Sequence, residues 1–430
     1  LTTFTLNGAT RTFVVQPGTT ASGVHTVDAL LSKGTNNITV QTITAGGASG
    51  SSQGESNIGA IRLGEVNNLN ADTINLGGFN ARGEITMQSG LVAPTVTLRG
   101  TAGGSTRVAN INIGSTSSGT RSGDGTMSLN GAMVDALVGT MTVGTHIANA
   151  VLASTSSFTF NIGAVDATSV VLGNKTGTGT PVITASFNQG GGTAKIQTLT
   201  LGQNAGTDVP NFQASYNLAG GTLRASTIQA GTGAFNASSV RRIGWTGGSI
   251  SNYDGSTDLT INGVDITAAG RITIAASTTS AKNFAVDAGR TVTLGANTAL
   301  TAFATDVVVS KTGAGTLVLG GDSSAFGGTL ELAGGALEIG AVDTVSTFNA
   351  ANFTWNGGTT IHVDLSGAGG SDLLNLTGAF TKGTGSGFAF DFGGGGEAGG
   401  SYGLGVFSST NFLSGDFAAI NLGAGLVGQF

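Results

Sequence analysis

The sequence contains no cysteine, only four prolines and few charged residues. Without cysteine the chain can form neither a disulfide nor a thiolate metal site. Charged residues make up 9% of the chain, whereas ordinary globular domains have about 25%. The 17 Lys and Arg are outnumbered by 23 Asp and Glu, so no basic surface for nucleic acid is predicted. No apolar run reaches the length of about 18 residues that a membrane-spanning helix requires.

Glycine is in excess, together with Thr, Val, Ile, Ser and Asn. Gly provides 75 of the 430 residues, but it does not recur at every third position and Pro is scarce, which excludes collagen. Hydrophobic residues make up 39% of the chain and the net charge is −6, which is not a disordered composition. These values indicate an ordered protein with an apolar interior and a largely uncharged surface.

Short runs of the sequence alternate between apolar and polar residues. Examples are Leu1–Leu6, Ile38–Ile43, Ile272–Ile274 and Val292–Leu294. Alternation of β-branched residues with Thr or Asn is typical of half-buried strands, and the residue choice disfavours helices. The sequence therefore predicts an all-β protein.

One four-residue motif, the phrase ending in Gly, recurs at irregular intervals: an apolar residue, a variable residue, a second apolar residue and then Gly. Its ten copies are Ile61–Gly64, Ile74–Gly77, Ile111–Gly114, Met141–Gly144, Phe160–Gly163, Val170–Gly173, Leu199–Gly202, Val292–Gly295, Leu317–Gly320 and Leu337–Gly340. Degenerate repetition is typical of stacked units that complete each other's core.

A right-handed parallel β-helix, or β-solenoid, accounts for this composition. Gly and Asn would form its corners, and Thr, Ser and Asn would take the outward ladders where stacked charges repel. With about 20–25 residues per coil, we expect on the order of 20 coils. Tandem β-sandwiches are the alternative, and pairs such as Asn130-Gly131 and Asp254-Gly255 are the hairpin turns that they would use.

The segment Val308–Gly340 carries a more specific pattern. It contains Lys311-Thr-Gly-Ala-Gly-Thr-Leu-Val-Leu319, then Phe326-Gly-Gly328, then Gly334-Gly-Ala-Leu337. This pattern resembles the autotransporter-associated β-strand repeat of secreted bacterial proteins, although Ser324-Ala-Phe326 stands where that family has Asn-Thr-Tyr. The resemblance implies a β-helical body and export from a bacterium.

Two further stretches are similar to the same group of exported proteins. Phe187–Thr193, Leu199–Gly202 and Tyr216–Leu223 resemble passenger regions of large surface proteins. The stretch from Asp372 to Phe430 looks like the region that precedes the anchor in PEP-CTERM proteins, but their sorting motif is not in this sequence.

The sequence and these resemblances together predict the domain organisation and the location. We expect a parallel β-solenoid over residues 1–340, including the repeat at 308–340, and a β-rich continuation or cap over residues 341–430. A first residue of Leu rather than Met fits removal of a signal peptide. The expected location is extracellular or on the bacterial cell surface.

No catalytic, cofactor-binding or metal site is predicted, and the protein is expected not to be an enzyme. His25, His146 and His362 have no second His at metal-ligand spacing, and Asp28 or Asp364 beside one His is too little to hold a metal. The Gly-rich runs Gly190–Gly192 and Gly393–Gly396 are interpreted as turns because no Lys-Ser/Thr follows them.

Three alternative interpretations would give the chain a chemical function. Asp254, Asp258 and Asp265 near Arg241, Arg242 and Trp245 could form a polysaccharide lyase or hydrolase site. Gly369–Asn375 is one imperfect copy of a calcium-binding nonapeptide, against an ordinary turn into a strand at 373–376. A sugar-stacking surface, against plain core filling, could use Trp245, Trp355, Tyr216, Tyr253 and Tyr402.

The functional hypothesis is an extracellular structural protein that polymerises. Both ends of the chain, Leu1–Leu6 and Ile420–Val427, are apolar β sequence, and open solenoid ends can template further strands into a filament. The expected partner is the chain itself, with an extracellular polysaccharide or the cell surface as further candidates. A monomeric passenger or adhesin with a missing C-terminal anchor is the alternative, and the glycan-cleaving enzyme is the second alternative.

Overall fold

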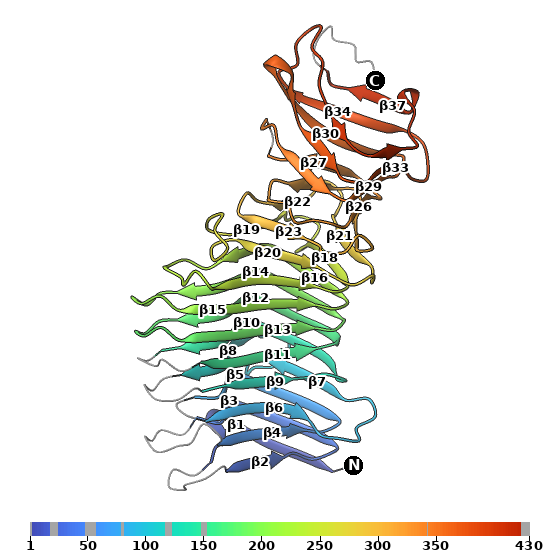
Figure 1. Ribbon diagram of the computed structural model, residues 1–430. Helices are drawn as coiled ribbons and strands as arrows, with labels where there is room; N and C mark the ends of the chain where they lie inside the picture. Colours follow the sequence, from blue (N-terminus) through green and yellow to red (C-terminus); the bar gives the residue numbers. More distant parts are fainter. Residues whose placement is uncertain are drawn as a thin grey trace. The chain divides into compact units, whose positions relative to one another are not determined.

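The computed structural model describes residues 2–17, 25–47, 57–78, 81–116, 123–147, 153–341 and 343–422. The chain is an all-β parallel β-solenoid of about 13 turns (Figure 1), which confirms the predicted fold class over tandem sandwiches. The described residues contain no α-helix, only the 3₁₀ turns Gly367–Gly369 and Ser414–Asp416. The right-handed sense and the limits at residues 340 and 341 stay predictions.

The chain divides into two compact units, which are described one at a time. The first comprises residues 1–223, 229–242 and 267–270, and the second comprises residues 224–228, 243–266 and 271–430. Strands β16 (Thr222–Ala230) and β17 (Val240–Trp245) hold residues of both units.

The first unit is a stack of coils made of long strands alternating with shorter ones. Its strands are β1 (Thr3–Val15), β2 (Thr26–Leu30), β3 (Thr35–Ala45), β4 (Ile58–Leu63), β5 (Val66–Leu76), β6 (Arg82–Met87), β7 (Thr95–Arg99), β8 (Val108–Thr116), β9 (Gly125–Ser128), β10 (Met133–His146), β11 (Ser154–Phe160), β12 (Ile162–Lys175), β13 (Val182–Gln189), β14 (Thr193–Asn204) and β15 (Asn211–Leu218).

The coils of the first unit are longer than the sequence predicted, so the expectation of about 20 coils is wrong. One coil runs from Met133 to its parallel partner Ile162, and the next from Ala164 to Thr193. The extra length lies in bent strands that serve two faces: the first half of β5 pairs with β7 and its second half with β8. Shorter coils, closer to the predicted length, occur in the second unit, where Thr316 pairs with Ala336 and Ala336 with Thr360.

The recurring phrase ending in Gly marks one corner of the first unit. Ile113, Val143, Leu172 and Leu201 are register partners at the ends of the inward apolar pairs. The Gly that follows each of them has φ between 68° and 78°, a left-handed conformation that side chains disfavour. The copy at Phe160–Gly163 differs, because it spans the end of β11 and the start of β12.

Inward side chains stack from coil to coil to form the core. Phe158, Phe187 and Tyr216 are fully buried, with successive ring centroids 4.8 and 4.9 Å apart. The Tyr216 hydroxyl donates a hydrogen bond of 2.5 Å to Oε1 of Gln189, which is also buried. Outward positions carry amide ladders, as where Asn217 Nδ2 donates to Asn188 Oδ1 at 2.8 Å. The predicted division into an apolar interior and Asn/Thr ladders is confirmed.

The second unit continues the parallel stacking with shorter strands. They are β18 (Gly248–Asn252), β19 (Leu259–Asn262), β20 (Ile272–Ala276), β21 (Lys282–Ala285), β22 (Thr291–Leu294), β23 (Thr298–Thr301), β24 (Val308–Thr312), β25 (Thr316–Leu319), β26 (Thr329–Leu332), β27 (Ala336–Ile339), β28 (Thr347–Ala350), β29 (Asn352–Trp355), β30 (Thr359–Ser366), β31 (Gly370–Ser371), β32 (Leu373–Leu376), β33 (Ala379–Lys382), β34 (Phe388–Gly394), β35 (Gly405–Val406), β36 (Ser409–Thr410) and β37 (Phe417–Ile420).

Buried lysines hold corners of the coils together. Lys311 is completely buried, and its ammonium donates to the carbonyl oxygens of Thr312, Gly313 and Gly334 at 2.8–3.0 Å. Burial lowers the pKa of Lys311 to about 8. Lys282 is buried in the same way, with its ammonium 2.7 Å from the carbonyl oxygens of Thr278 and Ser280.

Candidate functional site

The first coil of the first unit presents an open sheet edge. Strand β1 pairs in parallel with β3, and β2 with β4. Among the described residues no strand pairs with the opposite edge of β1 or β2. The backbone N–H and C=O groups on that edge of β1 are therefore available to a further strand.

The inward apolar side chains of the same coil are less buried than those of the next coil. Phe4, Leu6 and Phe13 are half-buried, whereas Ile38 and Ile43, the β3 partners of Leu6 and Phe13, are each 1% exposed. The difference arises because another coil covers β3 and none of the described residues covers β1. Exposed Val14, Val27 and Leu30, at 44%, 39% and 71%, extend this apolar margin.

A bulge interrupts the edge of β1 at its bend. The register with β3 shifts between Gly8 and Thr12, and exposed Arg11 lies in the shifted stretch. Bulges and charges are devices that limit pairing at sheet edges. Here they leave two regular segments, Thr3–Gly8 and Thr12–Val15, each in unbroken register with β3.

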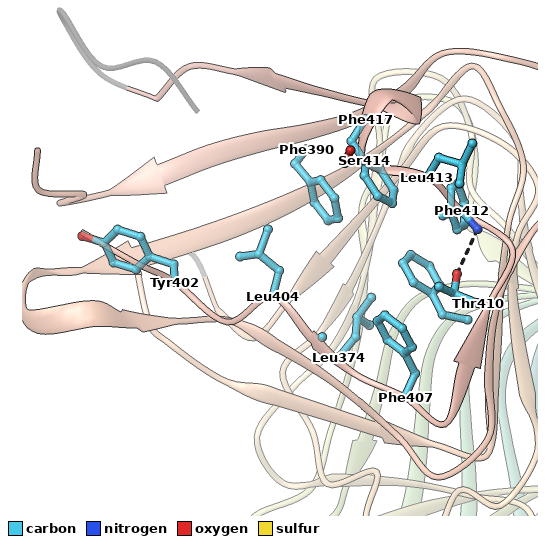
Figure 2. A pocket seen from close by; sticks show the side chains of 12 residues that line it. Leu374, Phe390, Tyr402, Leu404, Phe407, Thr410, Phe412, Leu413, Ser414 and Phe417 are labelled. Carbon is cyan, nitrogen blue, oxygen red and sulfur yellow. Dashed lines mark hydrogen bonds between the residues drawn. The ribbon is translucent and has the colours of Figure 1, made fainter. Parts of the chain in front are cut away.

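The last coils of the second unit form a second open edge beside an apolar cavity. Strands β35, β36 and β37 pair with β32, β33 and β34 respectively, and no strand of the described residues covers their other side. A cavity of about 440 Å³ opens there. Figure 2 shows its lining of Leu374, Phe390, Tyr402, Leu404, Phe407, Thr410, Phe412, Leu413, Ser414 and Phe417, with Phe380 and Gly405 completing it.

The rings around this cavity form a connected aromatic cluster. The centroid of Phe412 lies 4.8 Å from that of Phe380 and 4.8 Å from that of Phe417. Such rings fill the interior of earlier coils, so the cavity is the part of the core in the final coils that no further coil of the described residues covers. The predicted apolar ends include Leu1 and residues 423–427, which lie outside the described residues.

The histidines singled out in the sequence are not brought together. The backbone N–H of His25 donates to Asn57 Oδ1, and nearby Asp28 forms an ion pair of 2.9 Å with Arg62. His362 pairs through Nδ1 with Asp391 Oδ2 at 2.9 Å. Sequence reasoning missed Asp391, which is distant along the chain and becomes a neighbour because β30 and β34 pair in register.

The acidic residues considered for glycan cleavage serve turns and strand ends. Asp254 Oδ1 accepts hydrogen bonds from the backbone N–H and hydroxyl of Ser256. Asp258 Oδ1 accepts the backbone N–H of Thr291 at 2.9 Å. Arg241, in the first unit, is 1% exposed, donates to the Leu201 carbonyl and lies 3.7 Å from the ring centroid of Phe235.

The remaining candidates also have structural contacts. Trp245, Trp355 and Tyr216 are fully buried, so a sugar-stacking surface built from them is wrong. Gly369–Asn375 leads through Asp372 into strand β32, as its interpretation as a turn predicts. Within the described ranges no group of three or more His, Asp or Glu is arranged to hold a metal ion, and no helix is long and apolar enough to cross a membrane.

A scan against protein-family models and searches of curated proteins and of solved structures found no match to this chain. The assignment of the chain as a β-solenoid therefore rests on its own strand pairing and not on a relative. The resemblance to autotransporter-associated repeats rests on the motifs at residues 308–340.

Proposed function

We propose that this chain is a non-enzymatic extracellular structural protein whose copies stack end to end into a fibre, sheath or matrix. The observation that carries the proposal is the edge of β1, which no strand of the described residues pairs with, together with the half-buried side chains of Phe4, Leu6 and Phe13. Pairing with another parallel strand would satisfy the backbone groups and cover these side chains. Both changes favour association.

The positions of the two open edges determine how copies would meet. The described edge of β1 is the side of its sheet opposite to β3, and the edges of β36 and β37 face away from β33 and β34. The first coil of one copy would therefore pair with the last coils of another. A head-to-tail contact of this kind does not close on itself and extends into a filament.

The export of the protein is part of this proposal. The Lys311–Leu337 motifs resemble repeats of secreted bacterial proteins, and the Cys-free, weakly charged composition suits an extracellular location. A monomeric surface passenger or adhesin with an anchor outside this chain is the alternative. It has the same fold but requires that something cover the two edges.

Negative-stain electron microscopy across a concentration series tests the proposal. We expect uniform fibres that lengthen with concentration and survive both EDTA and high salt. Leu6→Lys places a charge on the core side of the edge strand and is expected to abolish the fibres. Thr168→Lys adds the same charge at an exposed position of β12 and should leave them intact. Isolated particles at every concentration would favour the adhesin.

A further inference from the structure

Acidic residues are concentrated in the C-terminal part of the chain. Residues 312–430 contain nine Asp and Glu but one Lys and no Arg, a net charge of −8. Residues 1–311 contain the remaining 14 Asp and Glu and 16 Lys and Arg, a net charge of +2. Carboxylates in residues 312–430 therefore have few cations in the same stretch to balance them.

Several of these carboxyl groups converge on one cavity. Glu338 on β27, His362 on β30 and Asp391 on β34 are register partners, so their side chains form a column on one face of three paired strands. Together with Asp343 and Asp364 they line a cavity of about 180 Å³. No Lys or Arg of the described residues lines it.

Asp372 adjoins this cluster through a hydrogen bond to the backbone of Asp364 and is 1% exposed. Its carboxylate accepts the backbone N–H groups of Ser346 and Asp364 at 2.6 and 2.8 Å. Asp364, 9% exposed, in turn accepts the backbone N–H of Thr344 at 3.0 Å. These hydrogen bonds fix the two carboxyl groups beside Glu338.

The strands that flank the column bring no compensating charge. Val318 on β25 precedes Glu338 in the register, and Ile420 on β37 follows Asp391. Asn421 donates to Asp391 Oδ1 at 2.6 Å. The carboxylate of Glu397 lies close to Gly367 and adds negative rather than positive charge. The ammonium of Lys382 forms an ion pair of 2.5 Å with Asp416.

The surroundings raise the pKa of two groups in the cluster. Burial, with the neighbouring charges of Asp364, Asp372 and Asp343, raises the pKa of Glu338 to about 7. Burial also raises the pKa of Asp372 to about 6, against the opposing effect of its two backbone hydrogen bonds.

We propose that this carboxyl cluster is an acid-sensitive latch that holds β27, β30 and β34 together in mildly acidic solution and loosens them as the pH rises through neutral. In the acidic state Glu338 and Asp372 carry protons, which reduces the repulsion inside the cluster. In the alkaline state Glu338 becomes an uncompensated negative charge beside Asp364 and Asp343. The three strands that carry the column then repel one another.

The direction of the effect follows from proton linkage. A carboxyl group whose folded-state pKa exceeds its unfolded value binds more protons when folded, so it adds stability at low pH and loses it as the pH rises through the folded value. With a pKa of about 7 for folded Glu338, the equilibrium between closed and open strands should shift about tenfold towards opening between pH 6 and pH 8.

Amide hydrogen exchange of the full chain tests the latch. After correction for intrinsic rates, protection factors in β27, β30 and β34 are expected to fall about twentyfold from pH 6 to pH 8, of which Glu338 contributes about tenfold and Asp372 about twofold. In Glu338→Gln, which mimics the protonated form, the fall should shrink to about twofold, the share left to Asp372. Glu331→Gln is the matched control. Glu331 on β26 lies outside the cluster, where its carboxylate accepts hydrogen bonds from Ser310 and Asn356.

The wild-type titration is informative even if Glu338→Gln does not fold. Protection that stays flat or rises between pH 6 and pH 8 would overturn the latch. So would a fall in Glu338→Gln as large as that of the wild-type chain.

The latch would also regulate assembly, a consequence that rests on the proposed function. Strand β34 carries Asp391 and pairs with β37 at the open edge, so loosening it removes the surface that receives the next copy. Fibres of the wild-type chain should form faster at pH 5.5 than at pH 8, and this difference should be much smaller for Glu338→Gln, where only Asp372 still responds. Absence of fibres at either pH would refute the assembly, while the exchange data would still decide the latch.

Discussion

At the scale of single residues, the chain uses its few buried polar groups to hold backbone that the strands leave unpaired. Lys311 is the clearest example, because one ammonium satisfies three carbonyl oxygens in two successive coils. Burying a cation without hydrogen-bond partners costs free energy. The Lys311 ammonium avoids this cost because it donates to carbonyl oxygens at a corner, where strand pairing supplies them with no N–H donor.

Lys311→Met should therefore destabilise the second unit. The substitution keeps much of the apolar stem but leaves three carbonyl oxygens without their donor, so we expect a loss of about 3 kcal/mol. Amide exchange in β24 to β27 measures it. Lys33→Met, at an exposed position of the first unit, is the control and should change little. Unchanged protection in Lys311→Met would show that water replaces the ammonium without cost.

At the scale of elements, close approach of backbone determines where glycine is required. Gly83 on β6 lies against the turn after β5: a Cβ built there would be 1.9 Å from the backbone nitrogen of Gly77 and 2.1 Å from the carbonyl oxygen of Ala45. Its register partners Gly59 and Gly125 meet backbone at 2.3 and 2.2 Å in the same way. A column of glycines thus lets two faces of each coil meet.

Gly83→Ala is accordingly expected to destabilise the first unit by about 2–3 kcal/mol, because backbone must move to admit one methyl group. Exchange protection in β4, β6 and β9 reports the change. Gly255→Ala is the matched control, since nothing lies within 4 Å of a Cβ at that position. Equal effects of the two substitutions would contradict the close-approach explanation.

Much of the fold was predictable because alternation and Gly spacing are local signals. Ile272–Ile274 and Val292–Leu294 are strands as their alternation predicts. The number of coils was not predictable, because the phrase ending in Gly marks one corner and does not show that a strand such as β5 bends to serve two faces. The carboxyl column was missed for a related reason: Glu338, His362 and Asp391 meet through a strand register that only the structure defines.

At the scale of the whole molecule, the described residues at the end of each unit form a surface that resembles an interior coil with its neighbour removed. Phe4 and Leu6 in the first unit, and the ring cluster around Phe412 in the second, would be core residues in any interior turn. Since the described strands at both edges are parallel to their partners, addition of a copy repeats a contact that the chain already makes internally. The central claim is that copies meet head to tail through these two surfaces.

Cross-linking of single-cysteine variants tests that claim most directly, because the natural chain has no cysteine. Thr5→Cys marks the edge of β1, Ala418→Cys marks β37, and one variant carries a mass tag. With a flexible bis-maleimide, we predict a cross-linked dimer only when the two variants are mixed, always containing one tagged and one untagged chain. Dimers from Thr5→Cys alone would show a head-to-head contact, and monomers in every sample would show that the edges do not associate; either result would contradict the account.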